Sequence, residues 1–302
     1  MMNRSRTLWV TMVCVHVGLF AGSGACSGQV AAGPASTAAQ ARHPFYAFCF
    51  DIHDAQQRDL EQQAAMLKQL GYDGAGHVGL EALTERLESL DRADLRLFVA
   101  GITVNLTQPP NEPLAQLKHA LPLLRNRQAV LYVVLTGYPP GDARGEEPAV
   151  TTLRTMADLA AQADVRLGLY PHTSDWVAQF AHAVSVANQV DRPNCGVIFN
   201  LCHFLRNEEA DTLPAVLRAA QPRLVGVTLN GADLAGKNDA DWGRLIQPLD
   251  RGSFDMRGLL RELKQINYRG PIGLMCYGIT GDATDHLARS IAHWHELRAE
   301  LE

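Results

Sequence analysis

Eight short apolar segments alternate along the 302-residue chain with longer segments in which apolar residues recur every three or four positions. Short apolar runs are typical of buried strands, and a spacing of three and four places side chains on one face of a helix. Strands that alternate with helices pair in parallel, because each helix returns the chain to the same end of the sheet. The predicted strands cover residues 45–52, 74–78, 95–104, 130–136, 165–170, 196–201, 224–229 and 272–277.

Two of the predicted helices have a clear buried face. The first carries Leu60, Ala64, Leu67 and Leu70, and the last carries Leu287, Ile291, Trp294 and Leu297. Eight strands separated by helices can close into a ring, whereas an open doubly wound sheet usually has fewer strands and often begins with a glycine-rich phosphate loop. No G-x-G-x-x-G motif follows the first segment. The sequence therefore predicts an α/β fold, a single-domain (β/α)8 TIM barrel.

The N-terminal segment has the order of a secretory signal. Arg4 and Arg6 precede an apolar run at residues 8–20, and small residues follow as far as Ala25. The run is shorter than the roughly 20 residues that a membrane-spanning helix needs, so no membrane span is predicted. The predicted domains are an export signal at 1–25, a flexible leader at 26–42 and the barrel at 43–302. We expect the mature protein in the periplasm or outside the cell.

The cysteines do not have the paired spacing of a zinc site. Cys26 follows small residues, so a lipid anchor at Cys26 is an alternative to simple cleavage of the signal. The barrel segment contains Cys49, Cys195, Cys202 and Cys276. Their apolar surroundings favour buried thiols. A bridge between Cys49 and Cys276 is the alternative, because the first and last strands of a closed barrel are neighbours.

The charge pattern argues against a nucleic-acid partner. The formal net charge is -5, and no lysine or arginine block interrupts the even spread of charges. A basic surface supplies most of the attraction between proteins and nucleic acid, and this chain lacks it. The sequence leaves the oligomeric state open.

Polar residues follow most of the predicted strands, at the end of a barrel where active sites lie. Asp51 and His53 would point to the same side if the first strand continues that far. The candidate catalytic residues are His172, His203, Asp233 and Lys237. The candidate substrate-binding residues are Asp51, His53, His77, Asn105, Asn200 and Asn230. Imidazoles and carboxylates move protons near neutral pH, and amides bind hydroxyls, so the predicted ligand is a small-molecule carbohydrate. Each residue alone could equally be a strand cap.

Three segments resemble one known family over roughly residues 45–300. They are the stretch Pro248-Leu-Asp-Arg-Gly-Ser-Phe-Asp255, the later Gly270-Pro-Ile-Gly-Leu strand, and Asn200-Leu-Cys-His203 at the end of the sixth strand. The sequence thereby resembles the xylose isomerase-like TIM barrel family, which includes sugar phosphate isomerases and epimerases and an apurinic endonuclease branch. The resemblance implies a divalent metal held by a glutamate, an aspartate, a histidine and a glutamate after strands five to eight.

The positions that correspond to these metal ligands carry other residue types. They are Tyr170, Asn200, Asn230 or Thr228, and Met275, none of which is a carboxylate or an imidazole. Hard cations such as magnesium require anionic oxygen ligands, so the usual metal site is expected to be replaced.

Three hypotheses follow. The leading one is an exported sugar isomerase/epimerase-like protein that transfers a proton next to a sugar carbonyl. The alternative is a non-catalytic carbohydrate-binding barrel. In the third, His172 and His203 form a rearranged metal site completed by Asp233 or Glu81.

Overall fold

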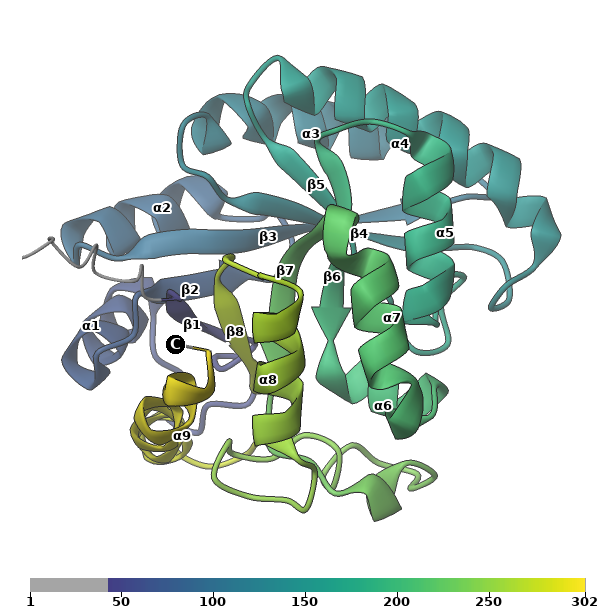
Figure 1. The fold of residues 1–302 in the computed structure, drawn as a ribbon. Helices are drawn as coiled ribbons and strands as arrows, with labels where there is room; N and C mark the ends of the chain where they lie inside the picture. Colours follow the sequence, from purple (N-terminus) through teal and green to yellow (C-terminus); the bar gives the residue numbers. More distant parts are fainter. Residues whose placement is uncertain (1–42, 302) are drawn as a thin grey trace, which may run out of the picture. The chain divides into compact units, whose positions relative to one another are not determined.

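A computed structural model describes residues 43–301, in which eight parallel strands close into a barrel surrounded by helices (Figure 1). The strands pair in chain order, and β8 pairs with β1 to close the ring. The strands are β1 (Phe45–Phe48), β2 (Gly74–His77), β3 (Arg96–Asn105), β4 (Val130–Thr136), β5 (Arg166–Leu169), β6 (Cys195–Asn200), β7 (Leu224–Leu229) and β8 (Ile272–Met275). The predicted (β/α)8 TIM barrel is confirmed.

The helices lie outside the strands and bury one face each. They are α1 (Leu60–Leu70), α2 (Leu83–Arg92), α3 (Asn111–Leu124), α4 (Glu146–Ala161), α5 (Phe180–Val190), α6 (Leu201–Asn207), α7 (Leu213–Ala220), α8 (Met256–Gln265) and α9 (Ala283–Leu297). The four residues predicted on the inner face of the last helix are buried in α9: Leu287, Ile291, Trp294 and Leu297. None of the helices in residues 43–301 has the length and apolar character needed to cross a membrane. The predicted export signal, the leader and Cys26 lie outside the described residues.

The first strand is shorter than the sequence predicts. It ends at Phe48 because Cys49 adopts a left-handed conformation with φ of 57° and the chain turns out of the sheet. The alternation expected to place Asp51 and His53 on the same side therefore does not reach them, and that expectation is wrong. All four cysteines of the barrel are buried free thiols, including Cys49 and Cys276.

Large aromatic rings fill the barrel interior where neighbouring strands carry glycine. The Tyr46 ring lies against Gly273, and the Tyr132 ring lies against Gly101. A Cβ atom at either glycine would overlap the facing ring, so only glycine fits at these two positions. Tyr46 also stacks on Phe98, with ring centroids 4.9 Å apart. The interior is consequently a packed aromatic core, and it forms the floor beneath the carboxyl ends of the strands.

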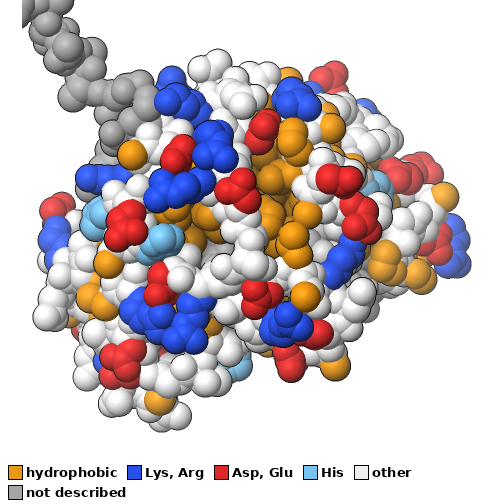
Figure 2. Space-filling model, turned by 60° about the horizontal axis from the view of Figure 1, so that its bottom comes forward, with side chains coloured by type: hydrophobic (Ala, Val, Ile, Leu, Met, Phe, Trp, Pro, Cys, Tyr) orange, Lys and Arg blue, Asp and Glu red, His pale blue; other side chains and the backbone are white. Residues whose placement is uncertain are grey.

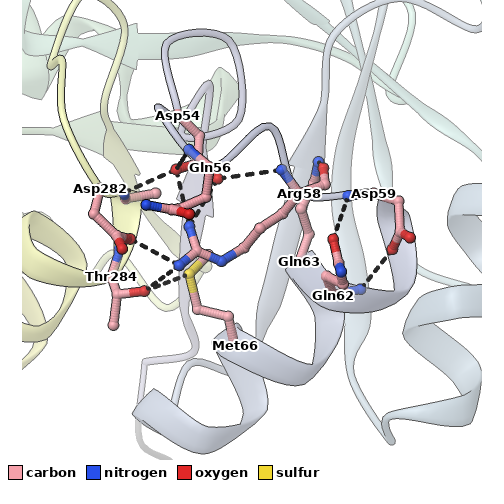
Figure 3. A network of polar contacts seen from close by, with 10 residues as sticks. Asp54, Gln56, Arg58, Asp59, Gln62, Gln63, Met66, Asp282 and Thr284 are labelled. Carbon is pink, nitrogen blue, oxygen red and sulfur yellow. Dashed lines mark hydrogen bonds and ion pairs between the residues drawn. The ribbon is translucent and has the colours of Figure 1, made fainter.

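An ion-pair network joins the loop after β1 to the loop after β8, across the seam where the barrel closes (Figure 3). Arg58 Nη1 lies 2.8 Å from Asp54 Oδ2, and Arg58 Nη2 lies 2.8 Å from Asp282 Oδ1. Arg58 also donates to Thr284 Oγ1 at 2.9 Å, and Asp54 Oδ1 accepts from the Ala283 amide at 3.1 Å. The Arg58 guanidinium thus bridges a carboxylate of each loop, and the Ala283 and Ala55 amides add hydrogen bonds between the same two loops.

His286, buried on α9 near this network, should make stability pH-dependent. Burial lowers the pKa of His286 to about 4, whereas an unfolded chain binds a proton near pH 6.5. The unfolded state therefore binds more protons between these pH values, and stability is lost as pH falls through this window, by about 3 kcal/mol in full. We expect His286→Gln to lose less stability than the parent protein as the pH falls. The free energy of urea unfolding at several pH values measures this difference. The control is His119→Gln at the exposed His119 on α3, which removes a histidine without touching the buried site and is measured at the same pH values.

Candidate functional site

A cavity of about 980 Å³ opens at the carboxyl ends of the strands. Figure 2 brings the lower face of Figure 1 forward and shows a hollow with hydrophobic side chains in its depth and charged side chains around it. Polar side chains line the cavity from strands β3 and β4 and from the segments that follow β2, β5 and β6. They include Glu81, Thr103, Asn105, Thr136, His172, Asp175, His203 and Arg206. Such clefts are where barrel enzymes bind their substrates.

The floor of the cavity is apolar and uncharged. It is formed by Phe48, Tyr132, Tyr170, Ile246 and Met275, all of which are buried and pack against one another. Burial raises the pKa of the Tyr170 phenol well above its ordinary value, so this group is neutral at physiological pH. The Tyr170 hydroxyl accepts a hydrogen bond from the side-chain amide of Asn200. The floor therefore offers a ligand aromatic and aliphatic surface.

Two histidines lie side by side on the wall above this floor. The ring centroids of His172 and His203 are 4.5 Å apart, with an angle of 52° between their planes. His172 Nδ1 lies 2.7 Å from Asp175 Oδ2, and the His172 side chain is 47% exposed. A carboxylate at Nδ1 orients the imidazole and leaves Nε2 to exchange protons with a ligand. His172 and Asp175 thus form a pair suited to a general base.

His203 is buried, whereas His172 is half-exposed. The pKa of His203 is lowered well below its ordinary value, mainly by burial and to a lesser extent by His172 and Arg206. His203 is therefore neutral near pH 7. The Thr173 amide donates to His203 Nδ1 at 3.2 Å, which makes Nδ1 the acceptor. The proton of the neutral ring therefore sits on Nε2. His203 is arranged to donate a hydrogen bond without carrying a charge.

Arg206 supplies the positive charge of the wall. Its guanidinium carbon lies 4.3 Å from the centroid of the Trp242 ring, and its nitrogens donate to the Asp239 and Asp241 carbonyls at 2.5 and 2.7 Å. No carboxylate within residues 43–301 forms an ion pair with Arg206, so its charge is uncompensated there. Trp242, considered from the sequence as a stacking residue, lines the cavity and packs edge-on against His203. Trp176 is fully buried away from the cavity.

Of the predicted catalytic residues, His172 and His203 line the cavity, whereas Asp233 and Lys237 do not. Both of the latter lie in the long loop between β7 and α8 and hold it in place. Asp233 accepts from the Ser253 amide at 3.0 Å and from the Gln247 side chain at 3.1 Å. Lys237 pairs with Glu209 at 2.6 Å.

Of the predicted substrate-binding residues, only Asn105 lines the cavity, where its Oδ1 accepts from the Thr107 amide at 3.0 Å. Asn230 is buried, and its side chain donates to the Leu245 carbonyl at 2.6 Å. Asn200 caps α6 and touches the floor through Tyr170.

Asp51 and His77 face the buried Arg86 instead of the cavity. Arg86 Nη2 lies 3.3 Å from Asp51 Oδ2, and Arg86 Nε lies 3.5 Å from His77 Nδ1. His53 packs edge-on against Tyr277, with ring centroids 5.1 Å apart. These three residues therefore support the loops that surround the cavity.

Asp175, Thr173 and Arg206 are the wall residues that sequence reasoning missed. The spacing of His172 and Asp175, three residues apart in the loop after β5, was an available signal for a histidine–carboxylate pair. Arg206 lies in α6, one helical turn after His203, and helical spacing places both on one face. Thr173 acts through its backbone amide, which every residue except proline has, so its residue type does not predict this role.

The donor set at the carboxyl ends does not fit a hard divalent cation. The positions implied by the resemblance hold a buried neutral phenol at Tyr170, an amide at Asn200 and a thioether at Met275. Asn230 uses its amide to donate to backbone carbonyls, and Thr228 contributes only a hydroxyl. Hard cations take anionic oxygen ligands. Within residues 43–301, no three His, Cys, Asp or Glu side chains are grouped to hold a metal, so a rearranged site on His172 and His203 lacks a third ligand.

The closed barrel and the cavity at its mouth define a (β/α)8 protein of the ligand-binding or enzymatic kind. The family model of the xylose isomerase-like TIM barrel matches residues 64–297. The chain belongs to the xylose isomerase-like TIM barrel family. No curated protein matches the sequence.

Solved structures with the same fold are distant in sequence. D-Allulose 3-epimerase from Methylomonas sp. in complex with D-allulose is 18% identical, with a TM-score of 0.66 over 85% of this chain and 97% of that one. The probable 3-DHS dehydratase AsbF from Bacillus anthracis is 13% identical, with a TM-score of 0.69 over 83% and 98%. The IolI protein with a bound zinc atom is 15% identical, with a TM-score of 0.69 over 86% and 99%. Identities this low establish the shared fold alone.

Proposed function

We propose that the protein is a carbohydrate isomerase/epimerase-like enzyme that moves a proton next to a sugar carbonyl. The observation that carries the proposal is the pairing of two histidines with different exposure and different hydrogen-bond partners, with ring centroids 4.5 Å apart on the wall of the mouth cavity. Proton abstraction beside a carbonyl needs a base and a donor that stabilises the oxygen as it gains charge. His172 and His203 supply these two roles. Epimerase and dehydratase activities in structural neighbours fit this class of reaction.

His172, oriented by Asp175, removes the proton from the carbon next to the carbonyl. The electron pair of that C–H bond forms the enediolate, and the negative charge develops on the carbonyl oxygen. His203 donates from Nε2 to that oxygen, and the guanidinium of Arg206 lowers the energy of negative charge nearby. For isomerisation, protonated His172 delivers the proton to the former carbonyl carbon, while the proton of the neighbouring hydroxyl passes to the former carbonyl oxygen and a new carbonyl forms. Epimerisation instead requires the original carbon to receive a proton on its opposite face, from solvent or after the enediolate has turned over in the cavity.

The usual metal ligands of the family are replaced in this proposal. Support comes from Tyr170 and Met275 in the floor and from Asn200 beside it. Their neutral donor groups do not suit magnesium or manganese. The proposed proton transfer uses only the side chains of His172, Asp175, His203 and Arg206. Purified protein should therefore give the same exchange rate before and after dialysis against a chelator, with metal content measured in both samples.

Hydrogen exchange with solvent tests the proposed function. The protein is incubated in heavy water with a panel of keto- and aldo-sugars, including D-allulose, D-fructose and D-xylose, and deuterium at carbon is followed by NMR. We expect incorporation at the carbon next to the carbonyl of at least one sugar. His203→Ala should abolish it while the circular dichroism spectrum stays that of the folded protein. Exchange that persists in His203→Ala would contradict the role assigned to this ring.

The second candidate is a non-catalytic carbohydrate-binding barrel. It is favoured by the aromatic floor, which lies where the family resemblance implies metal ligands. Aromatic rings bind the apolar faces of sugars without any chemistry. Sugar binding in calorimetry with no deuterium incorporation for any member of the panel would select this candidate over the enzyme.

We further propose that the mature protein acts outside the cytoplasm. Arg4, Arg6 and the apolar run that follows support export, and Cys26 supplies the site of an alternative lipid anchor. Fractionation of producing cells, with mass spectrometry of the mature N-terminus, distinguishes a cleaved soluble form from a lipidated one.

A further inference from the structure

We infer that the ligand is amphipathic, a hydroxylated ring that carries an apolar substituent, and that the substituent lies on Ile52, Val78 and Tyr277. This inference rests on the proposed function and specifies its substrate class. It starts from the exposed hydrophobic side chains. In residues 43–301 the large ones are Ile52, Val78, Leu234 and Tyr277, with 44%, 48%, 46% and 43% of their surface exposed. Three of these four line the mouth cavity.

The three side chains come from adjacent parts of the barrel. Ile52 follows β1, Val78 follows β2, and Tyr277 follows β8, and these strands pair with one another. Tyr277 is supported from one side by the His53 ring, whose centroid is 5.1 Å away. Ile52, Val78 and Tyr277 therefore form an apolar wall on the β8–β1–β2 side of the mouth. Among the described residues, Glu81 is the one charged residue that lines the cavity on that side.

The opposite side of the same cavity is polar. Thr136 ends β4, His172 follows β5, and His203 and Arg206 follow β6, which lie across the ring from β1. One cavity thus presents hydrogen-bonding groups on one side and exposed aliphatic and aromatic surface on the other. A ligand that fills both sides must itself have a polar and an apolar part.

The small area of the apolar wall and the volume of the cavity favour a small ligand over a protein partner. Stable protein interfaces bury about 800 Å² on each partner, which three side chains inside a cavity mouth cannot supply. Small-molecule sites measure about 300–1,000 Å³, and this cavity of about 980 Å³ lies at the upper end. It has room for a substituent beyond a single sugar ring.

Matched pairs of sugar ethers test the inference, and both members of each pair keep the free carbonyl carbon that the proposed proton transfer requires. The 6-O-methyl and 6-O-benzyl ethers of D-glucose, D-galactose and D-fructose are titrated into the full chain by calorimetry. For the sugar that binds, we expect the benzyl ether to bind about 10-fold tighter or more, because the ring is removed from water on the apolar wall. In the double variant Ile52→Ser/Val78→Ser the advantage should disappear. Leu234→Ser is the matched control, because Leu234 is equally exposed but lies outside the cavity, and it should keep the advantage.

The outcomes separate this inference from the function on which it rests. Equal affinity for the methyl and benzyl ethers overturns the amphipathic ligand and leaves sugar binding in place. A benzyl advantage that survives in the Ile52→Ser/Val78→Ser variant also overturns it, because the substituent then lies elsewhere. Absence of binding by every ether and by every free sugar of the exchange panel overturns both the inference and the proposed carbohydrate ligand.

Discussion

Replacing His172 with glutamine should lower the rate of solvent exchange at the sugar carbon by about 10²- to 10⁴-fold, the usual contribution of a positioned general base. His172 is the half-exposed imidazole of the pair, and Asp175 holds its Nδ1 at 2.7 Å, so Nε2 is the atom available to a ligand. Glutamine keeps much of the shape and the hydrogen-bonding capacity but takes up no proton. Sugar affinity, measured by calorimetry, should change far less than the exchange rate.

A second histidine–carboxylate pair gives the matched control for this experiment. His182 Nε2 lies 2.9 Å from Glu146 Oε1, on the outside of the barrel and away from the cavity. His182→Gln should leave exchange unchanged. Asp175→Asn should have an intermediate effect, because His172 loses its orientation but keeps its imidazole. An exchange rate in His172→Gln equal to that of the parent protein would remove His172 from the chemistry.

Replacing Arg58 with methionine should lower the free energy of unfolding by about 3–5 kcal/mol, the usual cost of leaving one partner of a buried ion pair uncompensated. The Asp54 side chain is only 2% exposed, and Arg58 is 17% exposed. Burial alone would raise the pKa of Asp54, but hydrogen bonds from the Ala283 amide and Arg58 outweigh it and lower the pKa. Without Arg58 this carboxylate remains buried beside the barrel seam. Urea unfolding monitored by circular dichroism measures the loss.

Arg127 provides the comparison for this prediction. It forms an ion pair with Asp91 at 2.8 Å, as close as the pair of Arg58 and Asp54, but the Asp91 side chain is 52% exposed. Arg127→Met should therefore cost at most about 1 kcal/mol. Equal losses in Arg58→Met and Arg127→Met would show that the seam network adds no more than a surface pair. The contribution of Asp54 should also vanish in acid, since a lowered pKa stabilises the fold only while the carboxylate is ionised.

The fold was readable from the sequence because the barrel repeats one pattern. The strands predicted at residues 130–136 and 224–229 have those bounds in the structure. The other predicted bounds differ from the structure, and the largest difference is at β1, which the sequence predicts to reach residue 52 and which ends at Phe48. That difference arises from a single backbone conformation. Cys49 takes a positive φ, which a cysteine rarely adopts and which no apolar pattern reveals.

The site was only partly readable, because loop partners lie far apart in the sequence. His172 and His203 reach the cavity since each follows a strand closely, as the barrel rule requires. Asp233 follows β7 almost as closely, and Lys237 lies four residues further on, yet that loop folds back on itself. Ser253, twenty residues along the chain, holds the Asp233 carboxylate. Nothing in the local pattern distinguishes a loop that supports itself from one that faces a ligand.

The packed rings beneath the mouth also limit how this barrel could change its chemistry. Met275 sits among Phe48, Tyr132 and Tyr170, so a glutamate introduced there alone would place an anion on aromatic surface with no counter-ion. Such a change would destabilise the chain before it created a coordination sphere. The glycines that accommodate these rings, Gly101 among them, would have to change together with the rings. One acidic substitution at Met275 therefore does not by itself prepare this floor for a cation, because the rings packed around that position would have to change with it.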